Sequence, residues 1–80
     1  MDTLTNLPTL HQFITSGGTI DIGRLEQFDC AAVASDPDVL WVALARRPGE
    51  QLTDLLRRLD DTLAHCLERN VRVNEVVMAA

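Results

Sequence analysis

Residues 49–70, GEQLTDLLRRLDDTLAHCLERN, decide the fold. Apolar residues recur in this stretch with the i, i+3, i+4, i+7 spacing of an amphipathic helix: Leu52, Leu55, Leu56, Leu59, Leu63, Cys66 and Leu67. At about 100° per residue they form one stripe, which must pack against other apolar surface. We therefore predict one long helix over residues 50–69. Asn70 ends it, because asparagine tolerates the left-handed conformation that closes many helices.

The opposite face of this predicted helix is charged. Asp54 and Arg58 lie four residues apart with opposite sign, and so do Arg57 and Asp61. Side chains with this spacing meet on a helix surface, and each such pair adds about 0.2–0.5 kcal/mol. We therefore expect two ion pairs along the solvent face. Glu50 precedes them, where a negative charge interacts favourably with the helix dipole.

The preceding segment, residues 29–46, predicts a β-hairpin. Two apolar runs, residues 29–35 and 39–46, flank an Asp-Pro-Asp sequence, which is typical of a turn. The second run is rich in β-branched and aromatic residues. Strict alternation divides it into two apolar faces, with Val39, Trp41 and Ala43 on one and Leu40, Val42 and Leu44 on the other. Both faces need cover, and the long helix covers only one of them.

The amino-terminal part predicts a short helix that ends at about Ser16. Its apolar face consists of Leu7, Leu10, Phe13 and Ile14. Thr9 and Gln12 fit a capping box, and Gly17-Gly18 ends the helix because glycine adopts positive φ without penalty. Residues 19–28 are ambiguous. Ile20 and Ile22 alternate as in a strand, but the spacing of three that continues through Leu25 to Phe28 favours a second short helix.

These elements together predict an α+β fold: a β-hairpin, residues 29–35 and 39–46, packed against one long amphipathic helix, residues 50–69, with one or two short helices before it. The first hairpin run is rich in alanine, so an all-α small bundle is the alternative. Eighty residues form a single small domain. Residues 71–80 alternate only at their start and predict a loose tail or an edge strand.

Composition excludes several classes of function. The net charge of −5 disfavours direct nucleic-acid binding, which relies on neutralising phosphates. The longest apolar run, residues 39–45, is far shorter than the roughly 20 residues that span a bilayer, so we expect no membrane association. Two cysteines make no disulfide framework, and no signal peptide is evident, so we expect a cytoplasmic location. The absence of Lys beside seven Arg favours a GC-rich bacterial genome.

No residue pattern meets the requirements of a catalytic, cofactor or metal site. His11, Cys30, His65 and Cys66 form no chelating pair. His65 and Cys66 are adjacent on the predicted helix, so their side chains diverge by about 100°. The same divergence separates the neighbouring carboxylates at positions 60 and 61. We therefore expect no cofactor, no bound metal and no catalytic residues.

The sequence favours a small non-enzymatic cytosolic protein that acts as a protein-interaction module and associates with itself as a homodimer. The interface residues we predict are Leu40, Val42, Leu44, Val71 and Val73, on the second apolar face of the strand and in the carboxyl-terminal segment. The alternative is an acidic regulator or inhibitor that binds a basic surface of a nucleic-acid-binding protein. A small enzyme or metal protein is a third and disfavoured class.

Overall fold

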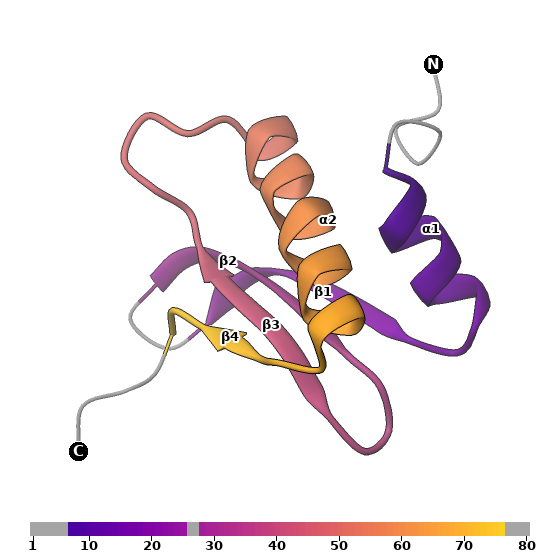
Figure 1. Ribbon diagram of the computed structural model, residues 1–80. Coiled ribbons are helices and arrows are strands. Elements are labelled where there is room, and N and C mark those ends of the chain that lie inside the picture. Colours follow the sequence, from indigo (N-terminus) through magenta and orange to yellow (C-terminus); the bar gives the residue numbers. More distant parts are fainter. Residues whose placement is uncertain (1–6, 26–27, 77–80) are drawn as a thin grey trace.

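The computed structural model describes residues 7–25 and 28–76 and confirms the α+β class (Figure 1). Its elements in chain order are α1 (Pro8–Thr15), β1 (Thr19–Leu25), β2 (Phe28–Ser35), β3 (Leu40–Ala45), α2 (Leu52–Arg69) and β4 (Val73–Asn74). The predicted hairpin is β2–β3 and the predicted long helix is α2. The all-α alternative is therefore excluded.

The four strands form one mixed sheet in the order β1-β2-β3-β4. The first three strands are antiparallel to their neighbours, whereas β4 pairs parallel to β3. Parallel neighbours need a long crossover connection, and α2 supplies it. As a result β1 and β4 are the two edges of the sheet, and the segment after α2 returns alongside β3.

Both helices pack on the same face of the sheet (Figure 1). The stripe of α2 supplies the centre of this core, because Leu55, Leu59, Leu63 and Cys66 are all 0% exposed. The rest of the core comes from the other elements: Leu7, Leu10, Phe13, Ala32, Ala34, Val42 and Leu44. Each buried leucine contributes roughly 1.5–3 kcal/mol, so this layer dominates the stability of the fold.

Residues 19–25 form strand β1, so the second short helix predicted there is wrong. The segment pairs with β2 from Thr19 opposite Ser35 to Leu25 opposite Phe28. A register shift after Gly23, whose φ is 149°, brings Leu25 and Phe28 across from each other. Their spacing of three therefore reflects the end of a hairpin and not a helix turn. Residues 26 and 27 of that prediction lie outside the described residues.

The β2–β3 register also corrects the predicted alternation in β3. Ala34 pairs with Val42, but the next residue of β2, Ser35, pairs with Leu40, so Trp41 is an additional residue in β3. Paired residues point to the same face of a sheet, so Leu40 shares the face that Ser35 occupies, opposite the helices. Trp41 instead packs against the core beneath the helices. The alternation holds only from Val42 onward.

Helix α1 lacks the predicted capping box. Its N-cap residue is Leu7, which makes no side-chain capping bond, and Pro8 occupies the first turn. A carboxylate from α2 replaces the local cap, because Asp60 Oδ1 accepts a hydrogen bond of 2.8 Å from the Leu10 amide. Asp60 is only 7% exposed. This single contact links the amino end of α1 to the middle of α2.

Candidate interaction surface

The sheet face opposite the helices carries apolar side chains over its two central strands, with Asp21 and Asn74 on its edge strands. We call it the outer face, and its apolar residues are Leu25, Phe28, Ala31, Val33, Leu40, Ala43, Ala45 and Val76. None of the described helices or strands covers it. The molecule measures 33 × 31 × 19 Å, and its short dimension has room for one helix layer and one sheet layer, which pack about 10 Å apart.

The centre of the outer face is made of small residues. Ala31 and Ala43 are 2% and 0% exposed, because Leu25, Phe28 and Val76 surround them. Beside Ala31, the missing side chain of Gly23 leaves a depression of about 140 Å³. Its lining residues are Asp21, Ile22, Gly23, Arg24, Leu25, Ala31 and Val33. Larger neighbouring side chains therefore cover the two alanines, and the depression beside Gly23 is the hollowed part of this face.

The structure does not bring the five predicted interface residues together. Val42 and Leu44 are 0% and 1% exposed in the core beneath the helices, so their side chains are unavailable to a partner. Val73 pairs with Val42 and packs on the same side. Val71 is 41% exposed just after α2, and only Leu40, at 44%, lies on the outer face. The interface itself stays a prediction, and the other outer-face residues were missed.

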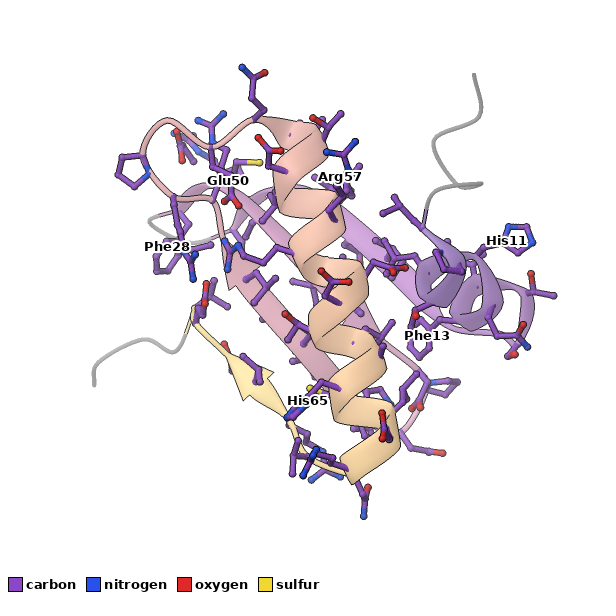
Figure 2. The ribbon with its side chains drawn as sticks, turned by 45° about the horizontal axis from the view of Figure 1, so that its top comes forward. His11, Phe13, Phe28, Glu50, Arg57 and His65 are labelled. Carbon is purple, nitrogen blue, oxygen red and sulfur yellow. The ribbon has the colours of Figure 1, made fainter. Side chains whose placement is uncertain are left out.

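A second hollow lies between the two helices, with a volume of about 490 Å³. Its lining residues are Pro8, Thr9, Gln12, Phe13, Ser16, Ala64 and Leu67. Figure 2 shows Phe13 directed from α1 toward α2. The α1 side of this groove is largely polar, whereas Leu67 on α2 is 41% exposed. Its exposed lining is mostly apolar.

Arg58 is the centre of a polar network at the amino end of α2, and its side chain is 17% exposed. Its Nε and Nη2 donate to the two carboxylate oxygens of Glu50, each at 3.0 Å. Nη1 donates to both oxygens of Glu75 at 3.2 Å, and Nη2 also donates to the Ala45 carbonyl at 2.8 Å. All three guanidinium nitrogens of Arg58 therefore donate hydrogen bonds.

The network changes the pKa values of its members. Hydrogen bonds from the Arg58 guanidinium and from the Arg47 amide lower the pKa of Glu50 to about 2. The bond to Glu50 raises the pKa of Arg58 above its usual range. The network therefore holds together the loop before α2, the end of β3 and the segment after β4. Figure 2 shows Glu50 beside the start of α2.

The ion pairs predicted on α2 do not form as expected. Arg58 turns to Glu50 and Glu75 in place of Asp54, because those carboxylates reach it from the loop before α2 and the segment after β4. Arg57 lies 3.9 Å from Asp54 and not beside Asp61. The Arg58 network also fixes the outer face, since the Glu75 amide donates to the Ala43 carbonyl at 2.7 Å and Val76 follows directly.

The Asp-Pro-Asp turn holds Trp41 in place. Asp36 Oδ1 accepts from the amides of Asp38 and Val39 at 2.8 and 2.7 Å, as the predicted turn requires. Its Oδ2 accepts from Trp41 Nε1 at 2.9 Å, and this bond lowers the pKa of Asp36. The Arg72 guanidinium lies 5.6 Å from the centre of the Trp41 ring. The cluster satisfies the indole N–H and joins the turn to the segment between α2 and β4.

The candidate metal ligands are dispersed. Among the described residues, no group of three or more His, Cys, Asp or Glu side chains is placed to hold a metal ion. Figure 2 shows His11 and His65 on different helices, well apart. Cys30 and Cys66 are free thiols, and burial raises the pKa of the Cys66 thiol. Within residues 7–25 and 28–76, no helix is long and apolar enough to cross a membrane.

Comparisons of this chain with protein-family models, with curated proteins and with solved structures found no match.

Proposed function

We propose that this protein is a non-enzymatic protein-interaction module that binds through the outer face of its sheet and associates with itself. The observation that carries the proposal is the group of apolar side chains over β2 and β3 on this face, on which no described helix lies. Contiguous apolar surface on a small protein usually marks an interaction site. When a domain of 80 residues folds as a monomer, it buries a smaller fraction of its surface than a larger domain does. Association would bury more surface and add to its stability.

The polar groups support the same proposal. The Arg58 guanidinium donates hydrogen bonds to its two carboxylates, and Asp60 caps α1. Asp36 is occupied by the turn and by Trp41. These side chains form hydrogen bonds that stabilise the fold. Among the described surfaces, the outer face is therefore the one that we propose for binding.

Position-specific photo-crosslinking tests this proposal. A benzophenone amino acid at position 33, in the middle of the outer face, should form adducts with a protein when the chain is irradiated in an extract of its source cells. The same group at position 65 is the matched control, because His65 is exposed on α2, on the opposite side of the molecule. Adducts no more abundant at position 33 than at position 65 would contradict the proposal.

The acidic-regulator function is the second candidate. It is supported by the net charge of −5 and by three exposed acids on the solvent side of α2, Asp54, Asp61 and Glu68. Such binding to a basic protein would weaken strongly with added salt, since exposed charges are screened. Affinity for a basic nucleic-acid-binding protein that is the same at low and high salt would remove this candidate.

A further inference from the structure

We propose that strand β1 accepts an extended peptide of a partner protein as a fifth strand of the sheet, with an aromatic side chain of the peptide opposite Gly23. This inference concerns the edge of the sheet and goes beyond the self-association proposed above. Three observations carry it: the unpaired backbone of β1, the depression over Gly23, and the exposed side chains beside that glycine. Together they specify both the conformation and the side chains of the partner.

Strand β1 is the longer of the two edges of the sheet. Every second residue of an edge strand directs its N–H and C=O groups away from its neighbour. The backbone of β1 hydrogen-bonds to β2, and within residues 7–25 and 28–76 no other group bonds to it. The outward groups are spaced to pair with another strand at about 4.8 Å. The partner that satisfies them is therefore an extended peptide backbone.

The sequence of β1 leaves this edge open. Proteins protect exposed edges with proline, with lysine or with a bulge in the edge strand. Residues 19–25, TIDIGRL, contain neither proline nor lysine. At the register shift, the step from Gly23 to Leu25 in β1 lies opposite the longer step from Ala31 to Phe28 in β2. The additional residue therefore belongs to β2, and β1 keeps its alternation along its whole length.

The depression at Gly23 has about the volume of one aromatic ring. It measures about 140 Å³, and an engineered cavity of about 150 Å³ in another protein binds benzene. It lies on the outer face, where Gly23 pairs with Ala31. A Cβ atom at Gly23 would meet no other atom within 4 Å, so the space over this glycine is open. Aromatic side chains of a neighbouring strand pack over edge glycines of this kind, which makes the residue opposite Gly23 aromatic.

The residues around Gly23 specify the neighbours of this aromatic residue. Ile22 is 43% exposed and shares the helix side of the sheet with its pair Ala32, so a β-branched residue opposite it would cover it. Asp21 and Arg24 are exposed and form no ion pair within the described residues. A basic residue opposite Asp21 and an acidic residue opposite Arg24 complete two cross-strand pairs. For an antiparallel partner, the order is acidic, aromatic, β-branched, basic.

Titration of isotope-labelled protein with the blocked peptide TTEFVKTT, followed by NMR, tests strand addition. Binding should shift the amides of residues 19–25 and slow hydrogen exchange at the β1 amides that face the peptide. The same peptide with N-methyl groups on its phenylalanine and its valine is the matched control. One of these two amides must face β1, because neighbouring residues of a strand direct their amides in opposite directions. The methylated peptide should therefore show no binding.

Substitutions in the peptide and in β1 test the side-chain assignments. Replacing the phenylalanine by alanine should raise the dissociation constant about tenfold, because the depression at Gly23 then stays empty. Exchanging the glutamate and the lysine sets like charges opposite Asp21 and Arg24 and should weaken binding about three- to tenfold. Ile22→Lys should weaken binding about tenfold. Ile14→Lys should leave it unchanged, because Ile14 is also 43% exposed but lies on α1.

Three outcomes would overturn this inference. They are no binding of TTEFVKTT at millimolar concentration, equal affinity of the methylated peptide, and equal effects of Ile22→Lys and Ile14→Lys. If Ile22→Lys fails to fold, the alanine-substituted peptide tests the Gly23 assignment on wild-type protein, and an unchanged affinity contradicts it. A protein that associates through position 33 but binds no peptide would contradict this inference and keep the proposed function.

Discussion

Arg58 joins three segments that lie far apart in the sequence: the loop before α2, the end of β3 and the segment after β4. Arg58→Ala would leave the carboxylates of Glu50 and Glu75 without their partner. We expect a loss of about 2–3 kcal/mol in the free energy of unfolding, measured by urea denaturation. Val76 should also lose protection in hydrogen exchange, because Glu75 no longer holds its segment.

The neighbouring arginine is the matched control for this prediction. Arg57 is 67% exposed and contacts Asp54 only at 3.9 Å. Exposed pairs of this kind contribute little, so Arg57→Ala should change the free energy of unfolding by less than about 0.5 kcal/mol. Equal effects of the two substitutions would show that the Arg58 network does not hold the fold together.

Glu50 predicts how stability depends on pH. Hydrogen bonds from Arg58 and from the Arg47 amide hold its pKa at about 2 in the folded chain, below the ordinary value of 4.5. A lowered folded pKa stabilises the fold above the ordinary value, and this stabilisation is lost as the pH falls from about 4.5 toward 2. Urea midpoints should therefore decrease over this range. Glu50→Gln should flatten the decrease, whereas Glu68→Gln, an exposed control, should not.

At the scale of elements, Asp60 decides how α1 attaches to the rest of the fold. Its carboxylate accepts from the Leu10 amide, and the N-cap residue Leu7 makes no side-chain capping bond. Asp60→Ala should lower the free energy of unfolding by about 1–2 kcal/mol and increase exchange at the Leu10 amide. Asp60→Asn keeps an acceptor oxygen and should cost less. An unchanged Leu10 exchange rate in Asp60→Ala would contradict this role.

The elements also show how far the sequence predicts the fold. Helix α2 and the β2–β3 hairpin are predictable because each repeats its own period over many residues. The sequence favours a helix over β1 because this edge strand has largely exposed residues, so its alternation is weak and a chance spacing of three competes with it. Strand β4 has two residues and depends on a parallel pairing with β3, which no local pattern reveals.

The polar contacts are also hard to predict from the sequence, because they join residues that lie far apart along the chain. The i, i+4 rule assigns Arg58 to Asp54, but its partners lie 8, 13 and 17 residues away and meet it only after the sheet has formed. The sequence predicts only part of the outer face, because it shows that one strand is apolar on both sides but not which residues lie on each side. The additional residue at Trp41 then moved Leu40 onto that face, and a bulge of this kind leaves no sequence signal of its own.

At the scale of the whole molecule, the proposed self-association predicts that stability depends on protein concentration. Association that occurs only in the folded state stabilises it by mass action, by about 2.7 kcal/mol at a hundred times the dissociation constant. One kcal/mol shifts the melting temperature of a domain of this size by about 4–8 °C. We therefore expect the Tm of the wild-type protein to rise by on the order of 10 °C across a wide concentration range.

Scanning calorimetry of wild type and of Val33→Arg, which places a charge in the middle of the outer face, distinguishes this linkage from intrinsic stability. The variant should melt at one temperature at every concentration, because it lacks the partner that stabilises the folded state. At low concentration the two proteins should melt close together, since each is then a monomer with the same core beneath the helices. A wild-type Tm independent of concentration would mean that the two-layer fold is stable alone, and that the outer face adds nothing to stability through a second copy.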